Sequence, residues 1–205
     1  MQEFYSITMI FSIATFTLST VSSPGPNNIM LLSSGLTFGF KRTIPHMLGI
    51  MLGFPFMVLL VGLGLGLVFE KFPFIFSILK IVGILYLFWM AFKIANNKGK
   101  LELKEGEESK PFTFLQSAAF QWVNPKAWVM AITAISIFVT SKDDSFIQVL
   151  IIALIYLLSS IFSTSAWTAG GVVLKKFVKD EKTVRILNII MAILLVASVL
   201  PIILE

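Results

Sequence analysis

The sequence has no cysteine and a single histidine among its 205 residues, and charged residues make up only 13% of it. Without cysteine the chain can form neither a disulfide framework nor a thiolate metal site. A soluble domain of this length would carry about 25% charged residues. We therefore expect no metal or other cofactor, and the composition argues against a soluble domain.

Acidic residues are also missing from the interiors of the long apolar segments. Hard cations bind clustered carboxylates, and soft cations bind cysteine or histidine, so an ion permease would have few ligands here. An intramembrane enzyme would need an acid pair, a metal site or an activated nucleophile. We expect a protein that is not an enzyme. A passive channel or permease for another small solute or ion is the alternative to the transporter predicted below.

Hydrophobic residues make up 57% of the chain and occur in blocks. A transmembrane helix needs about 20 predominantly apolar residues. The sequence therefore predicts an all-α integral membrane protein in the lipid bilayer, with six transmembrane helices in one transporter domain over 1–205. The blocks run approximately over 4–40, 43–69, 72–95, 112–140, 146–174 and 186–204.

Proline motifs interrupt the first and the fourth block, which are both too long for one span. They read Ser-Pro-Gly-Pro-Asn-Asn at 23–28 and Gln-Trp-Val-Asn-Pro-Lys at 121–126. Because proline lacks a backbone N–H and clashes with the preceding turn, each helix must open there, either as a broken span or as a re-entrant segment. Opened backbone at membrane depth is tolerated only where it is buried in protein or lines a cavity. Paired breaks of this kind indicate a transporter's binding site.

The positions of the basic residues predict the topology. Most of the 16 Lys and Arg residues lie after the first, third and fifth blocks, whereas only Lys71 and Lys142 lie in the opposite loops. Cytoplasmic loops are enriched in Lys and Arg. Both termini are therefore predicted outside, with 96–111 as a cytoplasmic connector. The net charge of +5 reflects this topology rather than a nucleic-acid surface.

With this topology the two halves are inverted copies. The first repeat covers about 4–95 and the second about 112–204, which gives a 3+3 inverted repeat with helices 1 and 4 broken. When Pro26 is aligned with Pro125, the two breaks coincide. We expect both breaks to form the walls of one central site.

The residues at the two breaks suit an amino acid. The half-helix after Pro26 directs free amides and the positive end of its dipole at the break, which favours a carboxylate. Asn side chains and opened carbonyls can take the ammonium, although the Asn residues could simply cap the half-helices. Lys126 is charged in mid-span, which is typical of a functional residue, and snorkelling is the alternative. The predicted substrate-binding residues are Pro24, Gly25, Pro26, Asn27, Asn28, Gln121, Asn124, Pro125 and Lys126.

Three further features leave alternatives open. His46 is a candidate proton relay because histidine titrates near neutral pH, although a lone histidine at a membrane interface is often only amphipathic. Lys80 lies nearer a helix end and can snorkel. The spacing Gly49-x₃-Gly53 lets helices approach closely, either inside the chain, which we expect, or in a homodimer.

These motifs resemble the LysE family of amino-acid exporters, in its homoserine/threonine-efflux branch, and look closest to the cysteine/O-acetylserine exporter type. The resemblance implies export of amino acids or close derivatives, driven by proton exchange, across a bacterial inner membrane. By motif, Pro24, Gly25, Pro26 and Asn27 match the family's first signature, and Asn124, Pro125 and Lys126 match its second. The similar segments follow the family's order and are 23–42, 46–54, 79–94 and 120–138.

One departure from the lysine-exporting members bears on the substrate. Those members resemble this chain less at the first motif, where they have Gln in place of Asn27, and they carry an acidic residue in helix 2. Here that position falls at about Phe54. The resemblance thus implies a secondary active exporter, an antiporter, for small neutral amino acids rather than for lysine or arginine.

Overall fold

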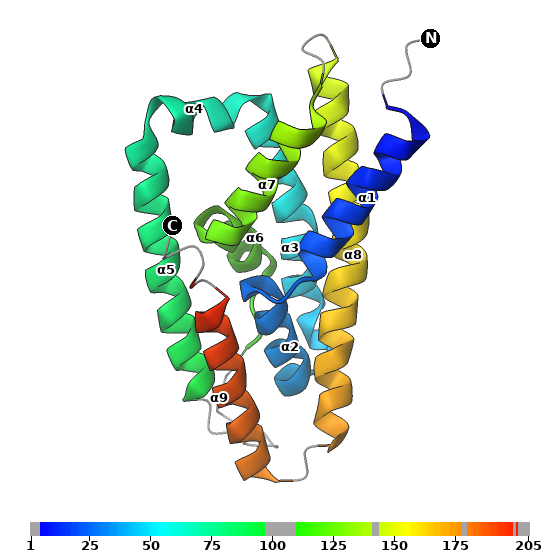
Figure 1. Cartoon of the computed structure of the whole chain (residues 1–205). Helices are drawn as coiled ribbons and strands as arrows, with labels where there is room; N and C mark the ends of the chain where they lie inside the picture. Colours follow the sequence, from blue (N-terminus) through cyan, green and yellow to red (C-terminus); the bar gives the residue numbers. More distant parts are fainter. Residues whose placement is uncertain (1–4, 97–109, 141–143, 178–179, 199, 201–205) are drawn as a thin grey trace.

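The computed structural model describes residues 5–96, 110–140, 144–177, 180–198 and 200. Within these ranges the regular structure is entirely helical (Figure 1). The all-α prediction is confirmed for this part of the chain. Most of the predicted connector 96–111 lies outside the described residues.

The first apolar block forms two helices that meet at the Pro-Gly-Pro motif. Helix α1 (Ile7–Ser22) and helix α2 (Pro26–Phe38) are bent by 57° at the break. In Figure 1 the chain descends from the N-terminus through α1 into α2. Gly39 alone separates α2 from α3 (Phe40–Leu60), and its φ of 78° lies in the left-handed region that glycine tolerates best.

The second block differs from the single straight span predicted for 43–69. A π-helical turn, η1 (Val61–Leu65), follows α3 and contains Gly64 with a φ of 116°. The chain then turns into the short helix α4 (Gly66–Lys71), which lies across one end of the molecule in Figure 1 before α5 (Pro73–Ala95) begins. A glycine with positive φ ends the span at this point because it breaks the helical backbone.

The second half repeats the broken arrangement. Helix α6 (Phe114–Val123) starts with a capping box between Thr113 and Gln116, and it ends where α7 (Pro125–Phe138) begins. The long helix α8 (Ser145–Phe177) and α9 (Glu181–Ala197) follow. Both predicted proline breaks are therefore present.

In the part of the chain that the structure describes, two helices are long and apolar enough by themselves to cross a membrane. They are Phe40–Leu65 and Ser145–Phe177, and the bent pair α1 and α2 makes a third span if it is counted as one. Shorter apolar helices cover Ser77–Phe92 and Pro125–Phe138 among the described residues. The six-span count stays a prediction.

Helix α8 is the centre of the packing, and α1, α2 and α3 all contact it. The closest approach is backbone to backbone. A Cβ added at Gly35 of α2 would lie 2.3 Å from Thr168 O, and one added at Gly171 of α8 would lie 2.2 Å from Leu32 O. Since glycine at these positions lets the helices touch, the small residues serve packing within the chain.

The helices α3 and α6 meet in the same way. A Cβ at Gly49 would lie 2.4 Å from Phe114 O, and one at Gly53 would lie 2.8 Å from the Cα of Ala118. The Gly49-x₃-Gly53 spacing is thus used inside the chain, as expected.

Gly171→Ala should destabilise the protein, whereas Gly170→Ala should not. The new methyl group at 171 meets backbone that cannot yield, and overpacking of this kind costs about 1–3 kcal/mol. At 170 the nearest atom is Leu32 Cδ1 at 3.5 Å, an ordinary contact. The apparent Tm of the purified variants in detergent, measured by thermal unfolding, should fall by several degrees for Gly171→Ala only. Equal Tm values for both variants would contradict the close packing of α2 against α8.

Candidate functional site

A cavity of about 30 Å³ lies where the two breaks meet. A water needs about 10–15 Å³ by this measure, so the cavity has room for about two waters. Five helices supply its walls: α1, α2, α3, α7 and α8. The lining residues are Thr20, Val21, Gly25, Pro26, Asn27, Asn28, Ile50, Phe54, Asn124, Lys126, Ala127, Met130, Ser160, Ser163 and Thr164.

Most of the predicted site residues line this cavity. Pro24, Gln121 and Pro125 are the exceptions: Pro24 is exposed, while Gln121 and Pro125 are buried outside the lining. Each exception contacts or adjoins a lining residue, as described below. The predicted residues that form the wall are Gly25, Pro26, Asn27, Asn28, Asn124 and Lys126.

Lys126 reaches across from α7 to the end of α1. Its Nζ donates to Ser23 Oγ at 2.7 Å, Ser23 O at 3.0 Å and Pro24 O at 3.2 Å. Ser23 O also accepts from Asn28 Nδ2 at 2.9 Å. The cation therefore sits at the negative end of the α1 dipole, where it satisfies carbonyls that the break leaves open.

The remaining open carbonyls of α1 are satisfied by side chains from α2 and α8. Val21 O accepts from Asn28 Nδ2 at 2.6 Å and from Ser163 Oγ at 2.9 Å. Ser22 O accepts from Trp167 Nε1 at 3.2 Å. Since an opened helix in lipid must be satisfied within the protein, these donors explain how the break is tolerated.

The N-termini of the two half-helices differ. Asn124 caps α7 because its Oδ1 accepts from Lys126 N at 3.2 Å, and Trp128 Nε1 closes the same break by donating to Trp122 O at 2.8 Å. Gly25 stands at the N-cap of α2 and provides no side-chain hydrogen bond. The α2 N-terminus therefore presents its positive dipole end to the cavity without a cap.

Asn27 and Gln121 form a reciprocal amide pair between the two motifs. Asn27 Nδ2 donates to Gln121 Oε1 at 2.8 Å, and Gln121 Nε2 donates to Asn27 Oδ1 at 3.1 Å. Gln121 Nε2 also donates to Ser117 O at 2.9 Å, one turn earlier in α6. The pair joins α2 to α6 beside the cavity.

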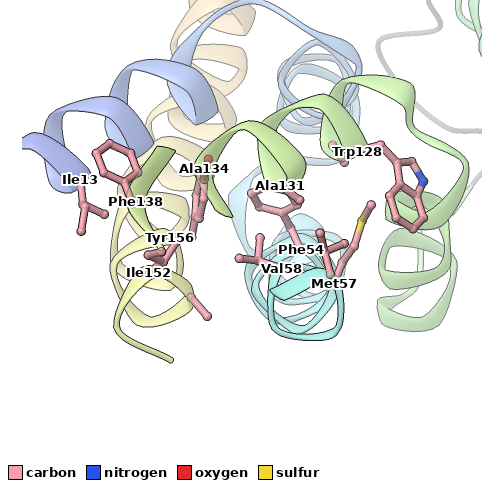
Figure 2. Close-up of a cluster of buried hydrophobic side chains, with 13 residues drawn as sticks. Ile13, Phe54, Met57, Val58, Trp128, Ala131, Ala134, Phe138, Ile152 and Tyr156 are labelled. Atoms are coloured by element: carbon pink, nitrogen blue, oxygen red, sulfur yellow. The ribbon is translucent and has the colours of Figure 1, made fainter. Parts of the chain in front are cut away.

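An apolar cluster closes the cavity on the side of α7. We call it the α7 cluster, and it shares Phe54 and Ala127 with the cavity wall. Figure 2 shows side chains from α1, α3 and α8 meeting α7, and the rings of Phe54 and Tyr156 pack edge to face at 4.9 Å. Its buried members are Ile13, Phe54, Met57, Val58, Val61, Ala127, Trp128, Ala131, Ala134, Phe138, Ile152, Ala153 and Tyr156.

A wider cavity of about 320 Å³, which we call the vestibule, lies between α2, the end of α5 and residues 110–112. Met30 lines the vestibule, and Asn27, three residues earlier on α2, lines the first cavity. One helical turn of α2 thus separates the two spaces. The lining residues of the vestibule are Met30, Ser33, Ser34, Thr37, Phe38, Met90, Ile94, Asn96, Lys110 and Phe112.

Sequence reasoning missed the hydroxyl groups of the wall. Ser160, Ser163 and Thr164 of α8 and Thr20 of α1 all line the cavity. The sequence offered a signal, because hydroxyl residues at i, i+3 and i+4 share one face of a helix, and a polar face inside an apolar span marks an interior surface.

His46 and Lys80 lie away from the cavity wall. His46 is 1% exposed, its ring packs 5.2 Å from that of Phe112, and neither ring nitrogen has a hydrogen-bond partner among the described residues. It is therefore buried within the protein. Lys80, on α5, is half-buried. The proton relay at His46 stays a prediction.

Comparison with known proteins identifies the family. Residues 18–201 match the LysE type translocator model. The chain belongs to the LysE type translocator family. It is 32% identical over 190 residues to the cysteine/O-acetylserine efflux protein of Escherichia coli (strain K12), covering 92% of this chain and 94% of that protein. The protein of the same name from Shigella sonnei (strain Ss046) matches equally well. No solved structure matches the chain.

The resemblance drawn from the motifs is thus confirmed. The translocator is a transporter and not an enzyme, and its apolar helices place it as a multi-pass protein of the bacterial inner membrane.

Asn28→Ala should destabilise the translocator through the first break. The substitution removes two hydrogen bonds, to Val21 O and Ser23 O, and each lost bond costs about 0.5–1.5 kcal/mol. The two carbonyls keep their second donors, Ser163 Oγ and Lys126 Nζ. Ser12→Ala is the matched control, since the exposed Ser12 hydroxyl bonds only within α1, to Thr8 O. Thermal unfolding in detergent should show a Tm lower by several degrees for Asn28→Ala alone, and a matching loss in the control would refute this role.

Gly25→Ala should act only through Lys126. Gly25 has an extended backbone that alanine adopts freely, but the new Cβ would lie 2.8 Å from both Cδ and Nζ of Lys126. We expect Gly25→Ala to lower the apparent Tm, and the double variant Gly25→Ala/Lys126→Ala to unfold at the same temperature as Lys126→Ala alone. Additive losses would show that the methyl group clashes elsewhere.

Proposed function

We propose that the translocator is a secondary active exporter of small neutral amino acids or close derivatives, with its substrate site at the junction of the two breaks. The observation that carries this proposal is the meeting of Lys126 and the uncapped N-terminus of α2 at one cavity. Both groups favour an anion, so together they suit the carboxylate of an amino acid.

The rest of the wall supports a neutral substrate. Among the lining residues none is acidic. The resemblance implies an acidic residue in lysine-exporting members at about the position of Phe54, which lines the cavity here. A cationic side chain would find no partner there, and an unpaired charge in this setting is costly. Small hydroxyl groups from Ser160 and Thr164 can instead hold a short polar side chain. The relatives named as cysteine/O-acetylserine efflux proteins point to the same substrate class.

Alternating access around an inverted repeat is part of the proposal. In a six-span topology, α1 with α2 corresponds to α6 with α7, and α3 corresponds to α8. The contact of α1 with α8 then corresponds to the contact of α6 with α3, and both contacts are present. Such an arrangement supports rocking of one half against the other around the site.

The arrangement of the cavities supports a closed state that opens to either side. The α7 cluster seals the side predicted to be outside, and one turn of α2 with the Asn27–Gln121 pair separates the cavity from the vestibule. The vestibule adjoins the predicted cytoplasmic loops. We propose that substrate enters from the vestibule when the amide pair parts.

The proposal has three further parts. Export is coupled to protons, the chain is a single domain with both termini outside, and two copies form a homodimer. His46 packs against Phe112, a residue of the vestibule wall, so a proton reaching it from the cytoplasm would arrive by that route. An apolar groove of about 430 Å³ between α5 and α9 is available to lipid or to a second copy.

Uptake into everted membrane vesicles, which expose the cytoplasmic face, should test the function. We expect accumulation of O-acetylserine, cysteine, serine, threonine or homoserine that a protonophore abolishes, and no accumulation of lysine. Lys126→Met should reduce this uptake by about 30-fold or more, since removing one partner of a desolvated charge pair costs about 2–5 kcal/mol. Lys80 lies on α5 outside the cavity wall, so the control variant Lys80→Met should transport normally.

Two results would reject the proposal. One is uptake of lysine alone, which would mean that the site binds a cationic side chain although its wall has Phe54 and no acidic residue. The other is normal uptake by a correctly inserted Lys126→Met protein.

A further inference from the structure

The Lys126 ammonium lies in a subsite of three oxygen atoms, and this subsite fits any primary ammonium. Ser23 O, Ser23 Oγ and Pro24 O lie 2.7–3.2 Å from Nζ. A primary ammonium has three N–H donors whether it belongs to lysine or to the α-carbon of an amino acid. Both carbonyls lie just beyond the C-terminal, negative end of α1, which favours a cation.

We propose that Lys126 is a tethered occupant of the subsite that binds the α-ammonium group of the substrate. The substrate displaces the Lys126 ammonium from the oxygens of Ser23 and Pro24 and pairs its own carboxylate with it. This inference rests on the proposed function, which places the carboxylate at Lys126 and the N-terminus of α2.

The size of the cavity favours such an exchange. With room for about two waters, the cavity cannot admit an amino acid while the end of Lys126 fills its edge. The lysine stem lies over Gly25. Because glycine has no Cβ, the Cδ and Nζ atoms of Lys126 can occupy the space that a Cβ would fill. The four-carbon stem is flexible, so the ammonium can swing away without a change in the backbone.

The exchange also keeps each ammonium group in contact with polar or charged partners. Before binding, one ammonium occupies the oxygens at the end of α1; after binding, the substrate ammonium occupies them and Lys126 faces the carboxylate. A compound with only an ammonium would leave Lys126 unpaired, and a compound with only a carboxylate would leave the α1 oxygens without a cation. Because unpaired charges at membrane depth are costly, the site selects zwitterions.

Chemical rescue of Lys126→Ala tests the subsite without a transport assay. We expect n-propylammonium chloride to raise the apparent Tm of the purified variant by about 5 °C, because a ligand that binds only the folded state stabilises it. Tetramethylammonium chloride, which has no N–H, should have no effect. Wild type and Lys80→Ala should respond to neither salt. Equal responses to the two salts, or no response in the variant, would overturn the inference.

Inhibition of the wild-type protein gives a second measurement that does not depend on a folded variant. O-Acetylserine, its analogue without the amino group (3-acetoxypropanoate) and its analogue without the carboxylate (2-acetoxyethylammonium) are compared as inhibitors of labelled O-acetylserine uptake. Both analogues should be at least about 10-fold weaker than the parent. If 3-acetoxypropanoate inhibits as well as O-acetylserine, the α1 oxygens do not bind the ammonium of the substrate.

The two proposals fail in different ways. Rescue by n-propylammonium in a protein that transports no amino acid would retain the ammonium subsite and reject the proposed function. Amino-acid transport without rescue would retain the function and reject the displacement of Lys126.

Discussion

A helix that opens within lipid must have its backbone groups satisfied by the protein itself, and the rest of the site depends on this constraint. The last carbonyls of α1 receive donors from three other helices: Asn28 on α2, Lys126 on α7, and Ser163 and Trp167 on α8. The break therefore joins four helices through hydrogen bonds. It is also the place where polar groups are concentrated in an apolar molecule, so the requirement for stability and the opportunity for binding coincide there.

The two breaks satisfy this constraint differently. The second closes with its own residues, since Asn124 caps α7 and Trp128 bonds to Trp122 O. The first combines Asn28 of its own motif with donors from α7 and α8 at its carbonyl end, and it has no side-chain cap at its amide end. A break whose backbone groups are bonded by its own neighbouring residues has few groups left for a ligand. A break that is bonded by side chains from other helices can exchange one of these donors for a donor of the ligand. This difference is the reason why we propose recognition at the first motif and an exchanging cation, Lys126, from the second.

The sequence predicts the two breaks because proline has a definite effect on a helix, and Pro26 and Pro125 begin the second half-helices as expected. It does not predict the turn into α4, since Gly64 lies in an apolar run with other glycines that remain helical, and only the backbone reveals its positive φ. The spacing of Ser160, Ser163 and Thr164 predicts one polar face on α8, but only the packing of α8 against the first break shows that this face lines the cavity. Pro24 and Gln121 were placed in the wall from their neighbours in sequence, yet they lie outside it, because the residues on either side of a break point in different directions.

The contacts also differ in how easily they can change. The pair α2 and α8, like the pair α3 and α6, is held backbone to backbone at glycine, where any sliding loses close contact at once. The α7 cluster instead consists of side chains such as Met57 and Phe138, which can repack. A transport cycle must open the cavity without exposing the carbonyls of α1 to lipid. Because each glycine-linked pair joins a helix of one half to a helix of the other, we expect the rocking halves to pivot about these contacts. Opening is then confined to the α7 cluster on one side and to the turn of α2 at the Asn27–Gln121 pair on the other.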